Sequence, residues 1–297
     1  MDESLYQSIL SQGAWVDLSA RAKWRLSGAD RVRYLNGQVT NDVRTVRAES
    51  ALHACVTNLK GKIDGDLRIH AHADSLLLDA PADLRETLGM RLEKYIIADD
   101  ALLEDVTDEW RLVHVMGNHG EAEGQAVKCE RFGLPGIDLW IPAADPLPSL
   151  RVYPLSEEDA ECLRILQKVP VWPNELNGDA FPPEAGLEKT AMSFTKGCYI
   201  GQEILSRIKT TGKMPRELIA WEQAEDSEDG IMAGAALCLP EKEIGVITSA
   251  TKHPVTQRMV GLGYVRQGLV PADSRLLVRG TPASITIHVK ISAILNQ

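Results

Sequence analysis

The sequence has few cysteines, and none of them forms a Cys-x-x-Cys pair. The chain of 297 residues contains five, an odd number spread widely along its length: Cys55, Cys129, Cys162, Cys198 and Cys238. A disulfide framework or a zinc site would need paired or clustered ligands, so this pattern favours neither. We therefore expect no metal site and at most one or two cysteines that take part in chemistry.

Positive charge and long apolar runs are also lacking. The chain has 32 Lys and Arg against 42 Asp and Glu, a net charge of −10, which disfavours bulk binding to nucleic acid. No apolar run approaches the length of a transmembrane helix, and the first four residues, 1–4, lack the features of a secretory signal. We expect a cytoplasmic protein without a membrane span.

The patterns that are present predict an α+β fold over the first two thirds of the chain. Hydrophobic residues make up 44% and charged residues 25%, as in globular proteins, and the length exceeds the usual single core. Helical spacing predicts helices capped by Asp30 and Ser156 and a third over 83–95. Period-two patterns predict strands over 24–27, 51–57, 66–72, 76–80, 101–104, 110–116 and 136–141.

A change of composition predicts a domain boundary near residue 216. Gly212, Pro215 and the acidic run 225–229 follow the last predicted helix. The spacing of the strands predicted beyond them is typical of a small β-barrel, which we expect over 217–297. These strands are 218–222, 235–239, 245–250, 259–266, 275–278 and 284–290.

One segment carries most of the candidate chemistry: Lys196, Gly197, Cys198, Tyr199, Ile200, Gly201, Gln202 and Glu203. Cys198 lies close to Lys196 and just before a predicted helix, and an ammonium group and a helix N-terminus both stabilise a thiolate. The alternative is that the glycines shape a turn around a small buried cysteine. Gln202 and Glu203 suit the first turn of that helix and are expected to fix the Cys198 loop.

This octapeptide matches the motif K-G-C-[FY]-x-G-Q-E, and the chain resembles the YgfZ family of tetrahydrofolate-binding proteins. Leu163-Arg164, Val169-Pro170 and Thr40-Asn41-Asp42 fit the same family, so the resemblance covers most of residues 24–216. It implies the fold of the aminomethyltransferase (T-protein) of the glycine cleavage system. That fold has two interleaved α/β subdomains, here about 1–45 with 150–216 and about 46–149, and the C-terminal barrel.

The resemblance also implies a function. It indicates a tetrahydrofolate-binding accessory protein that supports iron–sulfur cluster assembly or repair and iron–sulfur-dependent tRNA modification. Its partners would be iron–sulfur enzymes or assembly proteins, and Cys198 would be its working thiol.

Three positions depart from the related patterns. Gly65 replaces the first of two consecutive aspartates of aminomethyltransferases, Leu166 replaces the glutamate that holds their pterin, and Lys168 stands where the YgfZ family has glycine. One-carbon transfer without such a carboxylate loses a charge stabiliser and a proton acceptor, so we favour a folate binder. The alternative is an aminomethyltransferase-like one-carbon transfer enzyme in which Asp66 supplies the carboxylate.

Several polar side chains are candidate folate contacts. Lys60, Lys62 and Arg207 suit the anionic glutamate tail of folate, although all three could be solvated surface charges. The resemblance adds three more candidates: Asn58, Asp66 and Arg164. His70 and His72 share one face of a predicted strand, and without a third ligand we expect them to be surface residues rather than metal ligands.

Overall fold

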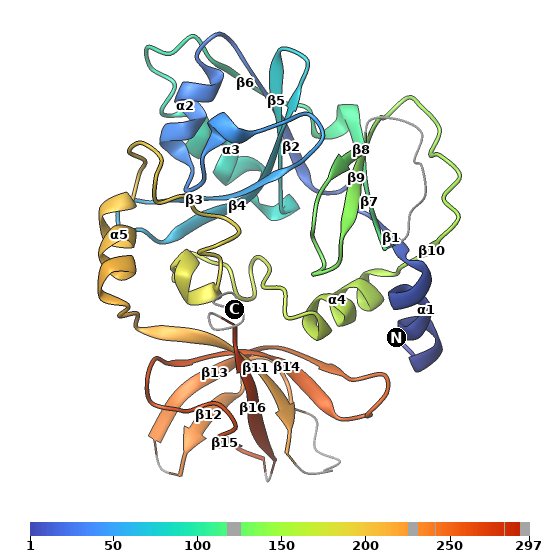
Figure 1. Cartoon of the computed structure of the whole chain (residues 1–297), viewed down its shortest axis with the longest axis vertical. Helices are drawn as coiled ribbons and strands as arrows, with labels where there is room; N and C mark the ends of the chain where they lie inside the picture. Colours follow the sequence, from blue (N-terminus) through green and yellow to red (C-terminus); the bar gives the residue numbers. More distant parts are fainter. Residues whose placement is uncertain (118–125, 225–230, 241, 282, 292–297) are drawn as a thin grey trace.

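Two five-stranded sheets and one closed six-stranded barrel make up the chain (Figure 1). The computed structural model describes residues 1–117, 126–224, 231–240, 242–281 and 283–291, so the acidic run 225–229 lies outside the described residues. In Figure 1 the barrel lies below the two sheets, and the segment that follows α4 (Glu157–Leu166) runs between them. The predicted α+β class with a C-terminal barrel is confirmed.

The first sheet contains the antiparallel ladder that the sequence predicts. Its strand order is β3-β4-β5-β2-β6. The strands are β2 (Ala22–Ser27), β3 (Leu52–Thr57), β4 (Ile63–His72), β5 (Ser75–Ala80) and β6 (Leu102–Asp105). Gly65 of β4 faces α3 (Arg85–Glu93), where an added Cβ would lie 2.7 Å from Cδ2 of Leu88. The glycine at this position therefore allows the helix to pack closely on the sheet.

The second sheet, of order β10-β1-β7-β9-β8, contains strands that the sequence did not reveal. β7 and β9 were predicted, but the shorter β1, β8 and β10 were not. The strands are β1 (Ala14–Asp17), β7 (Trp110–Met116), β8 (Ala126–Lys128), β9 (Gly136–Pro142) and β10 (Tyr153–Pro154). Sheet membership crosses the predicted subdomain limits, since β1 pairs with β7 and β2 pairs with β5. The exact division into subdomains, with limits near residues 45 and 149, stays a prediction.

The barrel closes in the order β11-β14-β13-β12-β15-β16. All six strands were predicted, most of them within two or three residues of their ends. They are β11 (Arg216–Gln223), β12 (Ala236–Leu239), β13 (Lys242–Lys252), β14 (Met259–Arg266), β15 (Arg275–Val278) and β16 (Ser284–Lys290). The buried apolar side chains of alternating strand positions fill its interior, and Trp221 is the largest of them.

Three other helices have Asp2, Asp30 and Gly201 as their N-cap residues. They are α1 (Glu3–Gln12), α2 (Arg31–Gln38) and α5 (Gln202–Thr211). Ser156 caps α4 as predicted, accepting a hydrogen bond from Asp159 N. Asp30 occupies the N-cap position of α2, but its carboxylate accepts a hydrogen bond from Asp100 N instead of capping the helix. No helix in the described ranges is long and apolar enough to cross a membrane.

A buried ion pair joins α4 to the barrel. The guanidinium of Arg164 lies 3.0 Å from Oε2 of Glu175, and both side chains are almost fully buried. Ser249 of β13 accepts a hydrogen bond from Arg164 and donates one to Glu175, each at 2.6 Å. Arg164, a candidate folate contact, therefore has a structural role here.

Removal of this arginine should destabilise the protein strongly. Arg164→Met leaves Glu175 buried and unpaired, which should lower the free energy of unfolding by about 3–5 kcal/mol in a urea titration. The matched control is Arg33→Met, which removes an exposed ion pair with Asp30 and should leave the unfolding curve nearly unchanged. Equal effects of the two changes would contradict this account.

Candidate functional site

A cavity of about 480 Å³ lies where both sheets, the segment after α4 and the end of the barrel meet. Small-molecule sites commonly have volumes of roughly 300–1,000 Å³. Its lining combines apolar side chains with cationic and other polar ones. The lining residues are Ala51, Leu52, His53, Arg68, Cys129, Glu130, Arg131, Gly133, Gln167, Lys168, Val169, Pro170, Ala185, Gly186, Leu187, Thr190 and Ile291.

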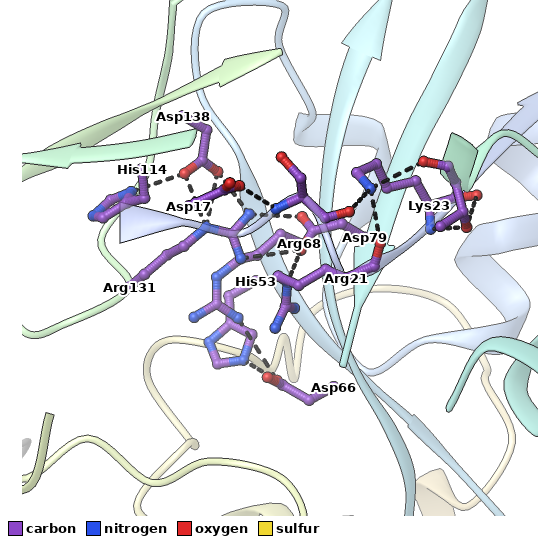
Figure 2. Close-up of polar contacts among 12 residues, drawn as sticks. Asp17, Arg21, Lys23, His53, Asp66, Arg68, Asp79, His114, Arg131 and Asp138 are labelled. Carbon is purple, nitrogen blue, oxygen red and sulfur yellow. Dashed lines mark hydrogen bonds and ion pairs between the residues drawn. The ribbon is translucent and has the colours of Figure 1, made fainter. Parts of the chain in front are cut away.

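Arg131 forms one wall of this cavity and binds two buried aspartates (Figure 2). Its guanidinium lies 2.7 Å from Asp79 of β5 and 2.7 Å from Asp138 of β9, and Arg21 pairs with Asp79 as well. Burial opposes the charge of each aspartate, but Arg131 outweighs it and holds the pKa of both carboxyls below the usual range. The negative charges of Asp79 and Asp138 are thus balanced by the guanidinium groups of Arg131 and Arg21.

Asp66, the candidate catalytic carboxylate, is held by His53 and Arg68. Nε2 of His53 lies 2.5 Å from Oδ1 of Asp66, and Nη1 of Arg68 lies 3.6 Å from the same oxygen. Burial and, after it, the charge of Arg68 lower the pKa of His53, so we infer that the neutral ring donates a hydrogen bond to the carboxylate. His53 and Arg68 line the cavity, whereas Asp66 stands behind them.

His70 is buried and His72 is half-buried, which corrects our expectation that both are surface residues. Both stand on the face of β4 that meets the second sheet, where His70 packs against Trp140 with ring centroids 4.9 Å apart. His72 packs against Trp110 at 5.4 Å. Burial lowers the pKa of His70 to about 4. Among the described residues, no group of three or more His, Cys, Asp or Glu side chains could hold a metal ion.

Lys196 does not serve the thiol in the way that the sequence suggested. Its ammonium donates hydrogen bonds of 2.6–2.7 Å to the carbonyl oxygens of Asn36, Val39 and Asn41 at the end of α2. Burial lowers its pKa to about 8. The lysine therefore satisfies carbonyl groups that the helix leaves unpaired, and this removes the ion-pair part of our argument for an activated Cys198.

The rest of the motif packs as a structural unit that leaves Cys198 exposed. Tyr199 is buried in an apolar cluster with Leu205 of α5. Gly201 has φ +88°, and an added Cβ would lie 2.6 Å from the carbonyl oxygen of Asn58. Cys198 is the exposed member among the five free cysteines, so the alternative that it is a buried filler is wrong.

The remaining motif positions show weaker constraints. Gly197 has open space where a Cβ would be added, so the turn does not need glycine for steric reasons. Gln202 and Glu203 lie in the first turn of α5, as predicted. Glu203 is exposed to solvent.

The other candidate folate contacts do not gather at the cavity. Asn58 and Lys60 line a second hollow of about 410 Å³ together with Arg91 of α3. Arg207 is exposed on α5, and Arg164 is engaged with Glu175. The structure instead brings together residues that sequence reasoning did not select: His53, Arg68, Arg131 and Lys168. The available signal was polar residues alternating with apolar ones along β4.

Comparisons with known proteins agree with this architecture. No protein-family model matches the chain. It is 24% identical over 301 residues to an aminomethyltransferase of Halalkalibacterium halodurans, covering 88% of this chain and 80% of that protein. It is 28% identical over 218 residues to the tRNA-modifying protein YgfZ of Sodalis glossinidius, covering 65% of this chain and 66% of that protein.

The structural comparison shows the fold. The aminomethyltransferase T of the glycine cleavage system from Bartonella henselae superposes with a TM-score of 0.83 at 17% identity, covering 96% of this chain and 88% of that one. The chain therefore has the aminomethyltransferase T-protein fold, as the resemblance implied. The sequence matches support a relationship to T-protein-like proteins.

Stability should fall in acid through His70. Because its folded pKa of about 4 is below the ordinary value of about 6.5, the unfolded chain binds more protons between these values, and stability is lost as the pH falls. From pH 7 to pH 5, wild type should lose about 2 kcal/mol more unfolding free energy than His70→Phe. Parallel pH profiles in urea titrations would contradict this expectation.

Cys198 should be the one thiol that reacts readily in the native protein. The other four cysteines are buried, so iodoacetamide at neutral pH should label one equivalent, located at Cys198 by peptide mass spectrometry. Cys198→Ala should abolish the labelling, whereas unfolding in urea should expose all five thiols. Labelling of one of the four buried cysteines at a comparable rate would contradict the expectation that Cys198 alone is accessible.

Proposed function

We propose that this protein binds a reduced folate, tetrahydrofolate or a derivative, in the central cavity and acts as an accessory protein rather than as an aminomethyltransferase. The observation that carries the proposal is the cavity itself, which has an apolar lining, cationic side chains and a volume of about 480 Å³, within the range of small-molecule sites. It lies in a T-protein fold, and relatives of that fold carry the name aminomethyltransferase.

The residues present fit such a ligand. Leu52, Val169 and Leu187 offer apolar contact for aromatic rings, and Arg68 offers a hydrogen-bond donor for a carbonyl or carboxylate group. A reduced folate, once bound, supplies nitrogen atoms that can accept one-carbon units. In this chain the lining residues would bind and orient it and exclude water from it.

The position of Asp66 argues against one-carbon transfer. Its carboxylate accepts the hydrogen bond of His53 and pairs with Arg68, so those side chains separate it from the cavity. Gly65, which replaces the other aspartate, faces α3 rather than the cavity. The Asp66 carboxylate is therefore not presented to the ligand as a proton acceptor.

The accessory role rests on the exposed thiol and on the similarity to a tRNA-modifying protein. Lys196 and Tyr199 are committed to structure, whereas Cys198 is exposed and can meet a partner. We infer that the partners are iron–sulfur enzymes of tRNA modification or the proteins that assemble their clusters. Folate binding and thiol chemistry would then occupy separate places on one molecule.

Calorimetric titration with tetrahydrofolate under anaerobic conditions tests the folate site. Thr190→Trp places a large side chain in the cavity lining and should weaken binding at least about tenfold, the loss expected when a ligand pocket is filled. Its matched control is Thr210→Trp on the exposed face of α5, which should bind as wild type does. Cys198→Ala should also retain binding. Absence of binding by folded wild-type protein would refute the proposal.

A further inference from the structure

Lys168 adopts a backbone conformation that favours glycine. It directly follows the C-cap of α4, with φ +61°, and its amide donates to the carbonyl of Ile165 while that of Val169 donates to the carbonyl of Arg164. This pair of hydrogen bonds is the Schellman helix end, whose left-handed residue is usually glycine. A lysine here retains a strained conformation, and strained residues concentrate at functional sites.

The strained backbone places Lys168 in the lining of the central cavity. Gly133, on the opposing loop, also has a positive φ, and an added Cβ there would lie 2.8 Å from Cβ of Gln167. The loop that carries Arg131 thus packs directly against the end of α4. This contact fixes the position of Lys168 relative to Arg131, which forms one wall of the cavity.

The charges around the cavity leave Lys168 uncompensated. Arg131 is matched by Asp79 and Asp138, and Arg68 is matched by Asp66. Within the described ranges, the ammonium of Lys168 has no hydrogen bond or ion pair, and it is partly buried.

The acidic side chain in the lining does not neutralise the positive charge of Lys168. Glu130 is the acidic residue among the described lining residues, and its side chain is exposed to solvent. The Lys168 side chain is therefore a lining cation without an acidic partner of its own, and a bound anion could pair with it.

We propose that Lys168 is a specificity-determining residue that pairs with a carboxylate of the ligand, namely the glutamate moiety of the reduced folate. The inference rests on the proposed function, since it takes the cavity to be the folate site. A lysine ammonium is a compact point charge on a flexible stem, which suits a carboxylate at the end of a mobile tail. The pairing would select folates over pterin compounds that lack glutamate.

Titrations of two ligands against matched variants test the pairing. Lys168→Gln should weaken tetrahydrofolate binding about fivefold, the effect of one partly exposed ion pair, while Lys168→Arg should bind within about twofold of wild type. 6-Methyltetrahydropterin, which carries no carboxylate, should bind wild type and Lys168→Gln equally. Lys213→Gln removes an exposed lysine away from the cavity and should leave both affinities unchanged.

A stability measurement separates ligand binding from a purely structural role. Lys168→Gly relieves the strained conformation and should raise Tm by roughly 2 °C while weakening tetrahydrofolate binding as the glutamine variant does. If wild type binds tetrahydrofolate and Lys168→Gln binds it equally well, the inference is overturned and the proposed function stands. If folded wild type binds neither ligand, both are overturned.

Discussion

The buried guanidinium of Arg131 is the interaction on which the arrangement of the two sheets depends. Asp79 belongs to the first sheet and Asp138 to the second, and both carboxylates have lost nearly all contact with solvent. Two such charges placed together repel each other and are costly to desolvate. Arg131 makes their proximity favourable by binding each through two nitrogen atoms, so it holds the sheets at a fixed separation. The cavity lies beside that junction, so the same ion pairs determine the position of Arg131 in its lining.

This charge balance also shapes what the cavity can do. The Asp66 carboxylate is bound by His53 and Arg68, so it stabilises these two lining side chains instead of facing a ligand. A T-protein fold can therefore retain a central cavity while the Asp66 carboxylate is turned away from it. Proteins that share a fold can differ in chemistry through a few side chains, so the shared fold alone does not establish transferase activity.

Local patterns predicted most of the fold but not the cavity. The strands of the barrel and the ladder β3-β4-β5 follow from short apolar or alternating segments between turn residues, a pattern that depends only on neighbouring residues. The helix α1 was missed although Asp2 caps it, accepting from Leu5 N, and Ile9 lies one turn further on. Arg131 and Lys168 could not be assigned, because their loops meet only in the folded chain. His70 was misplaced because a polar residue on a strand indicates solvent only when no second sheet covers it.

The cavity and the exposed thiol share one structural support at Asn41. The side-chain amide of Asn41 donates hydrogen bonds to the carbonyl oxygens of His53 and Thr190, two residues whose side chains line the cavity. Its own carbonyl accepts a hydrogen bond from Lys196, two residues before Cys198. The bonds at the His53 and Asn41 carbonyl groups are partly buried, whereas the bond at Thr190 is exposed, so loss of the first two would leave partly buried carbonyl groups unpaired. Asn41 thus connects the backbone of two cavity-lining residues to Lys196 of the motif that carries Cys198.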